Sequence, residues 1–220
     1  MMPRKLLVVL ALIVTAAALH AHEFWLMPDF AVRPGQLMKI VAHTGDRFPV
    51  GDSALELDHS ARGKVDVTGI RVLEKSTEAE VVVKEAGNYV IAVEIKPRPI
   101  ELAAGEFDDY LAPAGLISII EMRANAKQEN EPGKELYAKY AKSLVAVGSA
   151  KDDMATRALG LKLEIIPVKD PAQIRPGEKL PVRVLFDGRP LGNAQVSAVA
   201  GAFSQEGSPT YRSRHRATGW

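Results

Sequence analysis

The first feature of the chain is an apolar run at its amino terminus. Residues 6–19 are apolar apart from Thr15, and they follow the basic residues Arg4 and Lys5. As a helix this run is only about 20 Å long, which is too short for roughly 30 Å of bilayer hydrocarbon. A basic start, a short apolar run and small residues are typical of a secretory signal peptide. We therefore predict that residues 1–21 are a signal peptide and that the mature protein is exported to the periplasm without stable membrane insertion.

Two cleavage positions fit the small-residue rule for signal peptidase. Cleavage after Ala18 fits better by residue size, and cleavage after Ala21 makes His22 the new amino terminus. The chain has no cysteine, so neither a lipid-modified cysteine nor a disulfide is expected.

Residues 22–105 have the pattern of an N-terminal β-sandwich. Short runs of β-branched and aromatic residues alternate with turn residues, as in antiparallel sandwiches. A glycine-containing loop at residues 85–88 predicts that the strands on either side of it pair as a hairpin. The predicted strands cover residues 36–42, 65–73, 80–84 and 89–95.

Residues 106–150 change to a helical pattern, because leucine and alanine replace valine and threonine and apolar residues recur three and four apart. We predict a first helix within residues 107–120, broken near Pro113 to Gly115, and a polar loop over residues 125–133. A second helix is predicted to bury one face of six residues: Leu136, Tyr137, Tyr140, Ala141, Leu144 and Val145.

Residues 160–211 return to a β pattern and form the predicted C-terminal β-sandwich unit. Strands are predicted at residues 161–166, 179–186 and 194–200, with a turn at Asp187-Gly188. Residues 212–220 are basic and do not have a strand pattern. We interpret this tail either as a truncated end, which would leave the second sandwich without its last strands, or as a basic appendage.

The charge balance excludes some classes of partner. Without residues 1–21 the chain has 26 basic and 27 acidic residues, a formal charge of −1. No basic excess is available for nucleic acid or for an acidic membrane surface.

Candidate metal ligands are few. The mature chain has four histidines, so a transition-metal site must combine imidazole nitrogen with carboxylate oxygen. After cleavage at Ala21, the α-amino group and the ring of His22 would chelate one ion in a way that suits copper(II) or nickel(II). The further candidate ligands are His43, followed by Asp46 or Glu23 as oxygen donors, and His59 beside Asp58 as a reserve.

Catalytic motifs are absent from the sequence. It has no G-x-S-x-G elbow, no P-loop and no H-E-x-x-H segment. Asp108 and Asp109 are adjacent and point to different faces, so they cannot flank one glycosidic bond. We therefore predict that the protein is not an enzyme.

Four blocks of sequence resemble one family. They are His22 to Leu26, Glu106 to Leu111, Glu135 to Gly148, and Gly160 to Pro167 continuing into VRVLFDGRPLGNAQV. The chain resembles a bacterial family of exported proteins with a domain of unknown function, often labelled a periplasmic component of cobalt or nickel ABC-type transport. Relatives usually continue past this point with a further turn and an aromatic-rich closing strand.

The resemblance implies a fold and a function. The expected fold is mostly β, with two β-sandwich units, Ig-like or transthyretin-like, joined by a helical segment. The expected function is periplasmic binding of a transition metal ion, nickel, cobalt or copper, for delivery to a membrane metal importer. The alternative from the residues alone is a non-catalytic envelope adhesion or scaffold module that binds a protein partner.

Overall fold

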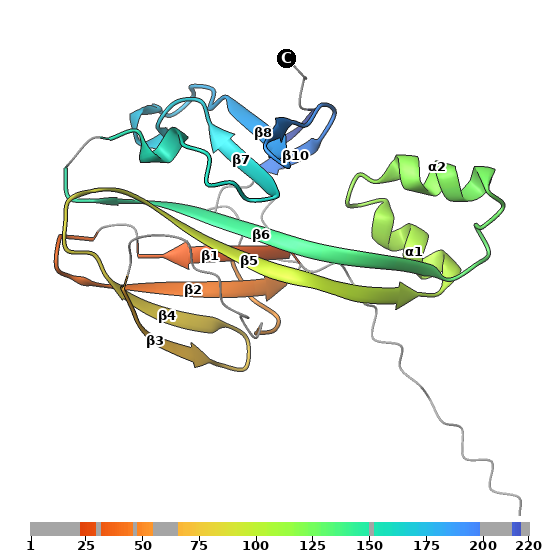
Figure 1. Ribbon diagram of the computed structural model, residues 1–220, viewed down its shortest axis with the longest axis horizontal. Helices are drawn as coiled ribbons and strands as arrows, with labels where there is room; N and C mark the ends of the chain where they lie inside the picture. Colours follow the sequence, from red (N-terminus) through yellow and green to blue (C-terminus); the bar gives the residue numbers. More distant parts are fainter. Residues whose placement is uncertain are drawn as a thin grey trace, which may run out of the picture.

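The computed structural model describes residues 23–29, 32–45, 48–54, 66–149, 152–198 and 213–216 (Figure 1). Within these ranges the protein is mostly β, with several antiparallel sheets and two α-helices. The predicted fold class is confirmed. None of the helices in the described ranges is long and apolar enough to cross a membrane.

The first layer is a four-stranded antiparallel sheet in the order β1-β2-β4-β3. Its strands are β1 (Glu23–Pro28), β2 (Leu37–Gly45), β3 (Asp66–Val72) and β4 (Thr77–Val82). Burial alternates along β2, where Met38, Ile40 and Ala42 are buried and the residues between them are less so. All three strands expected before residue 85 therefore form close to their predicted places, with β4 beginning three residues early, while β1 was not predicted.

The second layer is a long hairpin of β5 (Gly87–Leu102) and β6 (Gly133–Val147). The predicted hairpin across residues 85–88 is wrong, because β4 pairs with β2 and β3 while β5 pairs with β6. The glycine-containing loop instead carries the chain from one sheet to the other. A local turn signal does not determine which sheet the following strand joins.

The predicted helix over residues 136–145 is also wrong, because this segment lies within β6. Alternate residues of β6 face opposite layers. Ala141, Val145 and Val147 point one way, and Tyr140 and Leu144 point the other. Both faces of the strand are covered, so apolar residues occur on both and their spacing imitates a helical period.

The two layers pack face to face around one hydrophobic core. Met38, Ile40 and Val81 from the four-stranded sheet contact Val145 and Val147 from β6, and all five are buried. Figure 1 shows the hairpin crossing the sheet and extending beyond it. The layers thus form the sandwich expected for the N-terminal half, with part of its second sheet supplied from residues predicted to be helical.

The protruding end of the hairpin carries α1 (Ala104–Leu111) and α2 (Ile117–Asn125). The predicted break between the helices is confirmed, and Gly115 there has a φ of 77°. Phe107 and Leu111 are buried at the tip. Phe107 lies directly over Gly133, where any Cβ would overlap its ring. Only glycine at this position lets β6 pass beneath α1.

The C-terminal unit contains a three-stranded sheet of β7 (Leu163–Pro167), β8 (Val182–Phe186) and β9 (Arg189–Pro190). Asp187 and Gly188 have φ values of 49° and 73° and form the predicted turn between β8 and β9. Short 3₁₀ helices, η1 (Met154–Thr156) and η2 (Pro171–Gln173), precede β7 and β8.

A strand pair completes this unit. β10 (Gln195–Ala198) pairs with β11 (Ser213–Arg216) in an antiparallel register. The expectation that residues 212–220 have no strand is therefore wrong for residues 213–216. Backbone pairing with β10 compensates for the weak intrinsic strand propensity of this basic segment.

A buried ion pair joins the C-terminal unit to the hairpin. Lys142 Nζ of β6 lies 2.8 Å from Glu164 Oε1 of β7, and these side chains are only 12% and 1% exposed. Burial would raise the pKa of Glu164, but hydrogen bonds from Lys142 and from the Leu159 and Gly160 amides outweigh it, so that the pKa lies below its ordinary value. Glu164 is therefore a buried carboxylate whose charge is stabilised by hydrogen bonds from Lys142 and from two backbone amides.

We predict that Lys142→Met lowers the free energy of unfolding by about 3 kcal/mol, because it leaves the Glu164 carboxylate buried without its cation. The measurement is urea unfolding followed by circular dichroism. Lys134→Met is the matched control, since Lys134 pairs with Glu101 in an exposed position and should cost less than about 1 kcal/mol. Equal losses for the two variants would contradict a special role for the buried pair.

Candidate functional site

The face of the four-stranded sheet that points away from the hairpin has a mixed aromatic and polar character. Trp25 of β1 lies opposite His43 of β2, and Val41 lies opposite Glu78 of β4. Side chains alternate along a strand, so these residues share the face opposite to the core positions Ile40 and Ala42.

His43 is held flat against an aromatic neighbour. The His43 and Trp25 rings stack with centroids 5.8 Å apart and an interplanar angle of 26°. Phe48 contacts the same Trp25 ring edge-on at 5.6 Å. The imidazole therefore has little freedom to rotate, which is the condition for a preorganised ligand.

The segment 48–54 folds back over the end of β2. The Asp52 and Ser53 amides donate to the Thr44 carbonyl at 2.8 and 3.3 Å. Gly51 then rests on the imidazole, where a Cβ would lie 2.5 Å from His43 Nδ1. The returning loop therefore covers one side of the His43 ring.

The same loop places the Asp52 carboxylate against Gly45, at the end of β2. A Cβ on Gly45 would lie 2.6 Å from Asp52 Oδ2. Gly45 is two residues beyond His43 on the same face of β2, and it pairs with Glu23, whose side chain is exposed at the start of β1. His43, Asp52 and Glu23 thus lie around the end of the sheet where β1 begins and β2 ends.

The environment keeps the His43 ring neutral at physiological pH. Burial lowers the pKa of His43, and the Lys75 carbonyl and the charge of Glu78 only partly oppose it. Nδ1 is buried and forms no hydrogen bond with any described residue. The Lys75 carbonyl oxygen, like Nδ1, lies close to the place that a Cβ on Gly51 would occupy.

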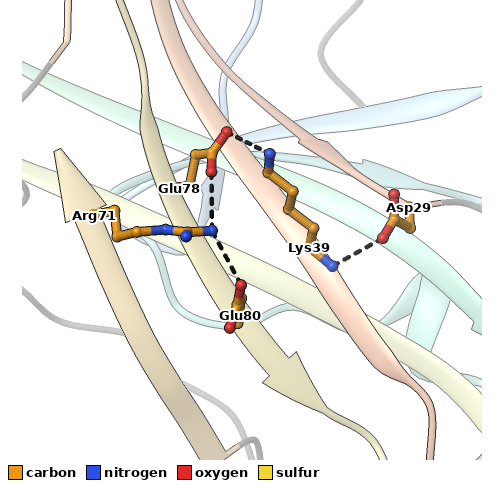
Figure 2. A network of polar contacts seen from close by, with 5 residues as sticks. All are labelled: Asp29, Lys39, Arg71, Glu78 and Glu80. Carbon is orange, nitrogen blue, oxygen red and sulfur yellow. Dashed lines mark hydrogen bonds and ion pairs between the residues drawn. The ribbon is translucent and has the colours of Figure 1, made fainter. Parts of the chain in front are cut away.

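A network of ion pairs covers the rest of this face (Figure 2). Glu78 lies between the ammonium group of Lys39 and the Arg71 guanidinium, which is 3.3 Å away and also reaches Glu80 at 3.1 Å. Asp29 accepts a 2.9 Å hydrogen bond from the Lys39 amide. Two cations already neutralise Glu78, so it is not a spare ligand for a metal ion.

The structure places two of the five predicted metal ligands. His43 and Glu23 lie at the sheet end described above, while His22, Asp46 and His59 lie outside the described residues. Across the part of the chain that the structure describes, no three histidine or acidic side chains gather around one possible ion position. Sequence reasoning missed Asp52, because its position depends on the loop that folds back over Gly45.

A family model described as a domain of unknown function (DUF4198) matches residues 19–219 of the chain. No curated protein matches it, and no solved structure does.

We predict that Gly51→Ala destabilises the protein by roughly 1–3 kcal/mol, because its methyl group would meet both the His43 ring and the Lys75 carbonyl. Urea unfolding measures the loss, and a Trp220→Phe background makes fluorescence report Trp25 alone. Gly69→Ala on β3 has open space at its Cβ and is the matched control. If both variants are equally stable, the loop does not pack on His43 as described.

We predict an NMR-titrated pKa for His43 below its ordinary value of 6.5. A histidine whose pKa is lower in the folded than in the unfolded state binds protons preferentially when unfolded, so the stability falls as the pH drops below about 6.5. His43→Gln should remove that part of the pH dependence. A His43 pKa at or above 6.5 would show that burial does not dominate.

Proposed function

We propose that this chain, which belongs to the family with the domain of unknown function DUF4198, is an exported protein of the bacterial cell envelope that binds one transition metal ion, nickel, cobalt or copper. In this proposal residues 1–21 direct export and are removed. The bound ion is cargo, which the protein delivers to a membrane metal importer.

The observation that carries the proposal is the fixed position of the His43 ring, which stacks on Trp25 at the end of the sheet. A metal ion binds the neutral imidazole, and burial already holds this ring neutral. Trp25 stacks on the ring, and Gly51 of the returning loop covers Nδ1. Nε2 is then the nitrogen that would bind the ion.

One oxygen donor for the same ion would come from the end of the sheet, either from Asp52, which lies over Gly45, or from Glu23, which starts the neighbouring strand. Imidazole with carboxylates suits nickel, cobalt, copper and zinc better than calcium or magnesium, which prefer oxygen alone. A further nitrogen would come from His22, the residue that directly precedes Glu23, if the signal peptide is cut after Ala21.

Such a site would release its ion readily. With one imidazole and few carboxylates the protein fills only part of the coordination sphere, and the remaining positions stay open to water or to an acceptor's ligands. Protonation of His43 would also eject the ion as the pH falls, because ligand nitrogen must be deprotonated. Both properties suit delivery better than permanent storage.

A second candidate function is a non-catalytic adhesion or scaffold module. The observation that favours it is the exposed apolar surface of α2, none of whose residues is buried. A surface of this kind fits a partner protein better than a small ligand.

We predict that the mature full chain, purified from the periplasm, binds one nickel, cobalt or copper ion in native mass spectrometry. His43→Ala and Asp52→Asn should weaken this binding at least about tenfold, since even an outer-shell partner is worth roughly 10–100-fold in metal affinity. A denatured spectrum of the same sample locates the cleavage site after Ala18 or Ala21.

His215→Ala is the matched control, because it removes a histidine from β11 of the other unit and should leave binding unchanged. Loss of the ion in His22→Ala alone would assign binding to the amino-terminal chelate and exclude His43 as a ligand. If none of the three metals binds, the metal proposal fails and the scaffold function remains.

A further inference from the structure

The four-stranded sheet ends in a strand with one free edge. β3 is the last strand in the order β1-β2-β4-β3, and among the described residues it pairs with β4 alone (Figure 1). The free side of an edge strand presents unpaired backbone N–H and C=O groups, to which an extended segment of another chain can add. We define the β3 edge by Ile70, Arg71 and Val72, the last three residues of the strand.

The register of β3 on β4 identifies the backbone groups that are free. The Leu73 amide donates to the Ser76 carbonyl at 2.8 Å, so these two residues form a hydrogen-bonded pair. Hydrogen-bonded and non-hydrogen-bonded pairs alternate along an antiparallel ladder. Arg71 therefore belongs to the next hydrogen-bonded pair, whereas Ile70 and Val72 do not. The N–H and C=O groups of Ile70 and Val72 point away from β4, toward the free edge.

The side chains of the same two residues are apolar and exposed. Ile70 and Val72 lie opposite Ala79 and Thr77 of β4, and these four residues share the core face of the sheet with Val81. Ile70 is nevertheless 39% exposed and Val72 is 56% exposed, so the hairpin does not cover this face at β3. A strand added at the β3 edge would take up the free backbone groups and cover part of both side chains.

The charged residue of the β3 edge does not guard it. Natural proteins often protect a free strand edge with a charged side chain or a proline. Figure 2 shows the Arg71 side chain directed over β4, where its guanidinium lies 3.3 Å from Glu78 and 3.1 Å from Glu80. The charge of Arg71 is therefore neutralised inside its own sheet, and it does not face an approaching strand.

The long strand β5 is different in this respect. Among the described residues it too has a partner on one side only, which is β6. Its outer half contains Pro97 and Pro99, which have no N–H group to donate to an added strand. β3 contains no proline. Strand addition is therefore impeded at β5 and open at β3.

We propose that β3 of one copy of this chain pairs with β3 of a second copy, antiparallel and about a two-fold axis, so that two four-stranded sheets become one sheet. Centring the pairing on Ile70 lets Ile70 of the two copies exchange both backbone hydrogen bonds. In this register Arg71 faces Gly69 of the second copy, and the space around the Cβ position of Gly69 is open. Centring on Arg71 would oppose two guanidinium groups, and centring on Val72 would place Ile70 opposite residues beyond the end of the strand.

A second copy is the partner because the β3 edge is complementary to itself. In the two-fold arrangement an apolar side chain meets its own counterpart on the core face, and the arginine of the other face meets a glycine. Pairing uses the only edge that takes part, so assembly stops at two chains. β4 and β2 lie between this edge and Trp25 of the candidate metal site, so the dimer does not involve the proposed metal ion.

The test is sedimentation velocity of the mature full chain over a range of concentrations, with a chelator present to remove metal ions. We expect a monomer–dimer equilibrium. Val72→Lys should raise the dimer dissociation constant at least about tenfold, because a lysine on an edge strand disfavours pairing with another strand. Val168→Lys is the matched control, since Val168 is 54% exposed and lies outside the β3 edge, and it should leave the equilibrium unchanged. Circular dichroism verifies that both variants are folded.

Hydrogen exchange followed by NMR shows whether the dimer forms through β3. The Ile70 and Val72 amides should exchange freely in the monomer and become protected in the dimer, while the Leu73 amide should be protected in both, since it is bonded within its own chain. A dimer with unprotected Ile70 and Val72 amides overturns the proposal, as do assemblies larger than two chains. A chain that stays monomeric at every concentration also overturns it and leaves a strand of another protein as the occupant. Because the test is done without metal, its failure is separable from failure of the proposed function.

Discussion

The tertiary structure depends on the burial of β6 between two layers. One face of this strand packs on the four-stranded sheet through Val145 and Val147, and the other carries Lys142 to Glu164 of the C-terminal unit. Desolvating two charges is expensive, and the pair persists because the carboxylate also accepts hydrogen bonds from two backbone amides. The two buried charges are compensated only when Lys142 and Glu164 meet in this arrangement. The ion pair therefore fixes how the C-terminal unit sits on the hairpin, which apolar packing alone would specify less strictly.

The candidate site arises from the other side of the same sandwich. The core face of β2 takes the aliphatic residues, so the outer face is left for His43, and Trp25 stacks on it from the neighbouring strand. Two glycines then allow the following loop to return across the strand end: Gly51 fits over the imidazole, and Gly45 leaves room for Asp52. The chemistry of the site is thus a consequence of where the sheet ends and how closely its loop can approach.

The sequence by itself determined the mostly β class, the strands β2, β3 and β4 of the first sheet, the break between α1 and α2, and the turn at Asp187-Gly188, because each depends on alternation or on residues with special backbone preferences. Only the tertiary structure decided that residues 133–147 form a strand. Their apolar residues lie on both faces, and a strand covered on both sides has no period of two to distinguish it from a helix. The same holds for Asp52, whose position over Gly45 is set by a returning loop, and for β11, which gains its structure from pairing with β10. Long-range contacts determined these three features, and the local sequence pattern does not contain them.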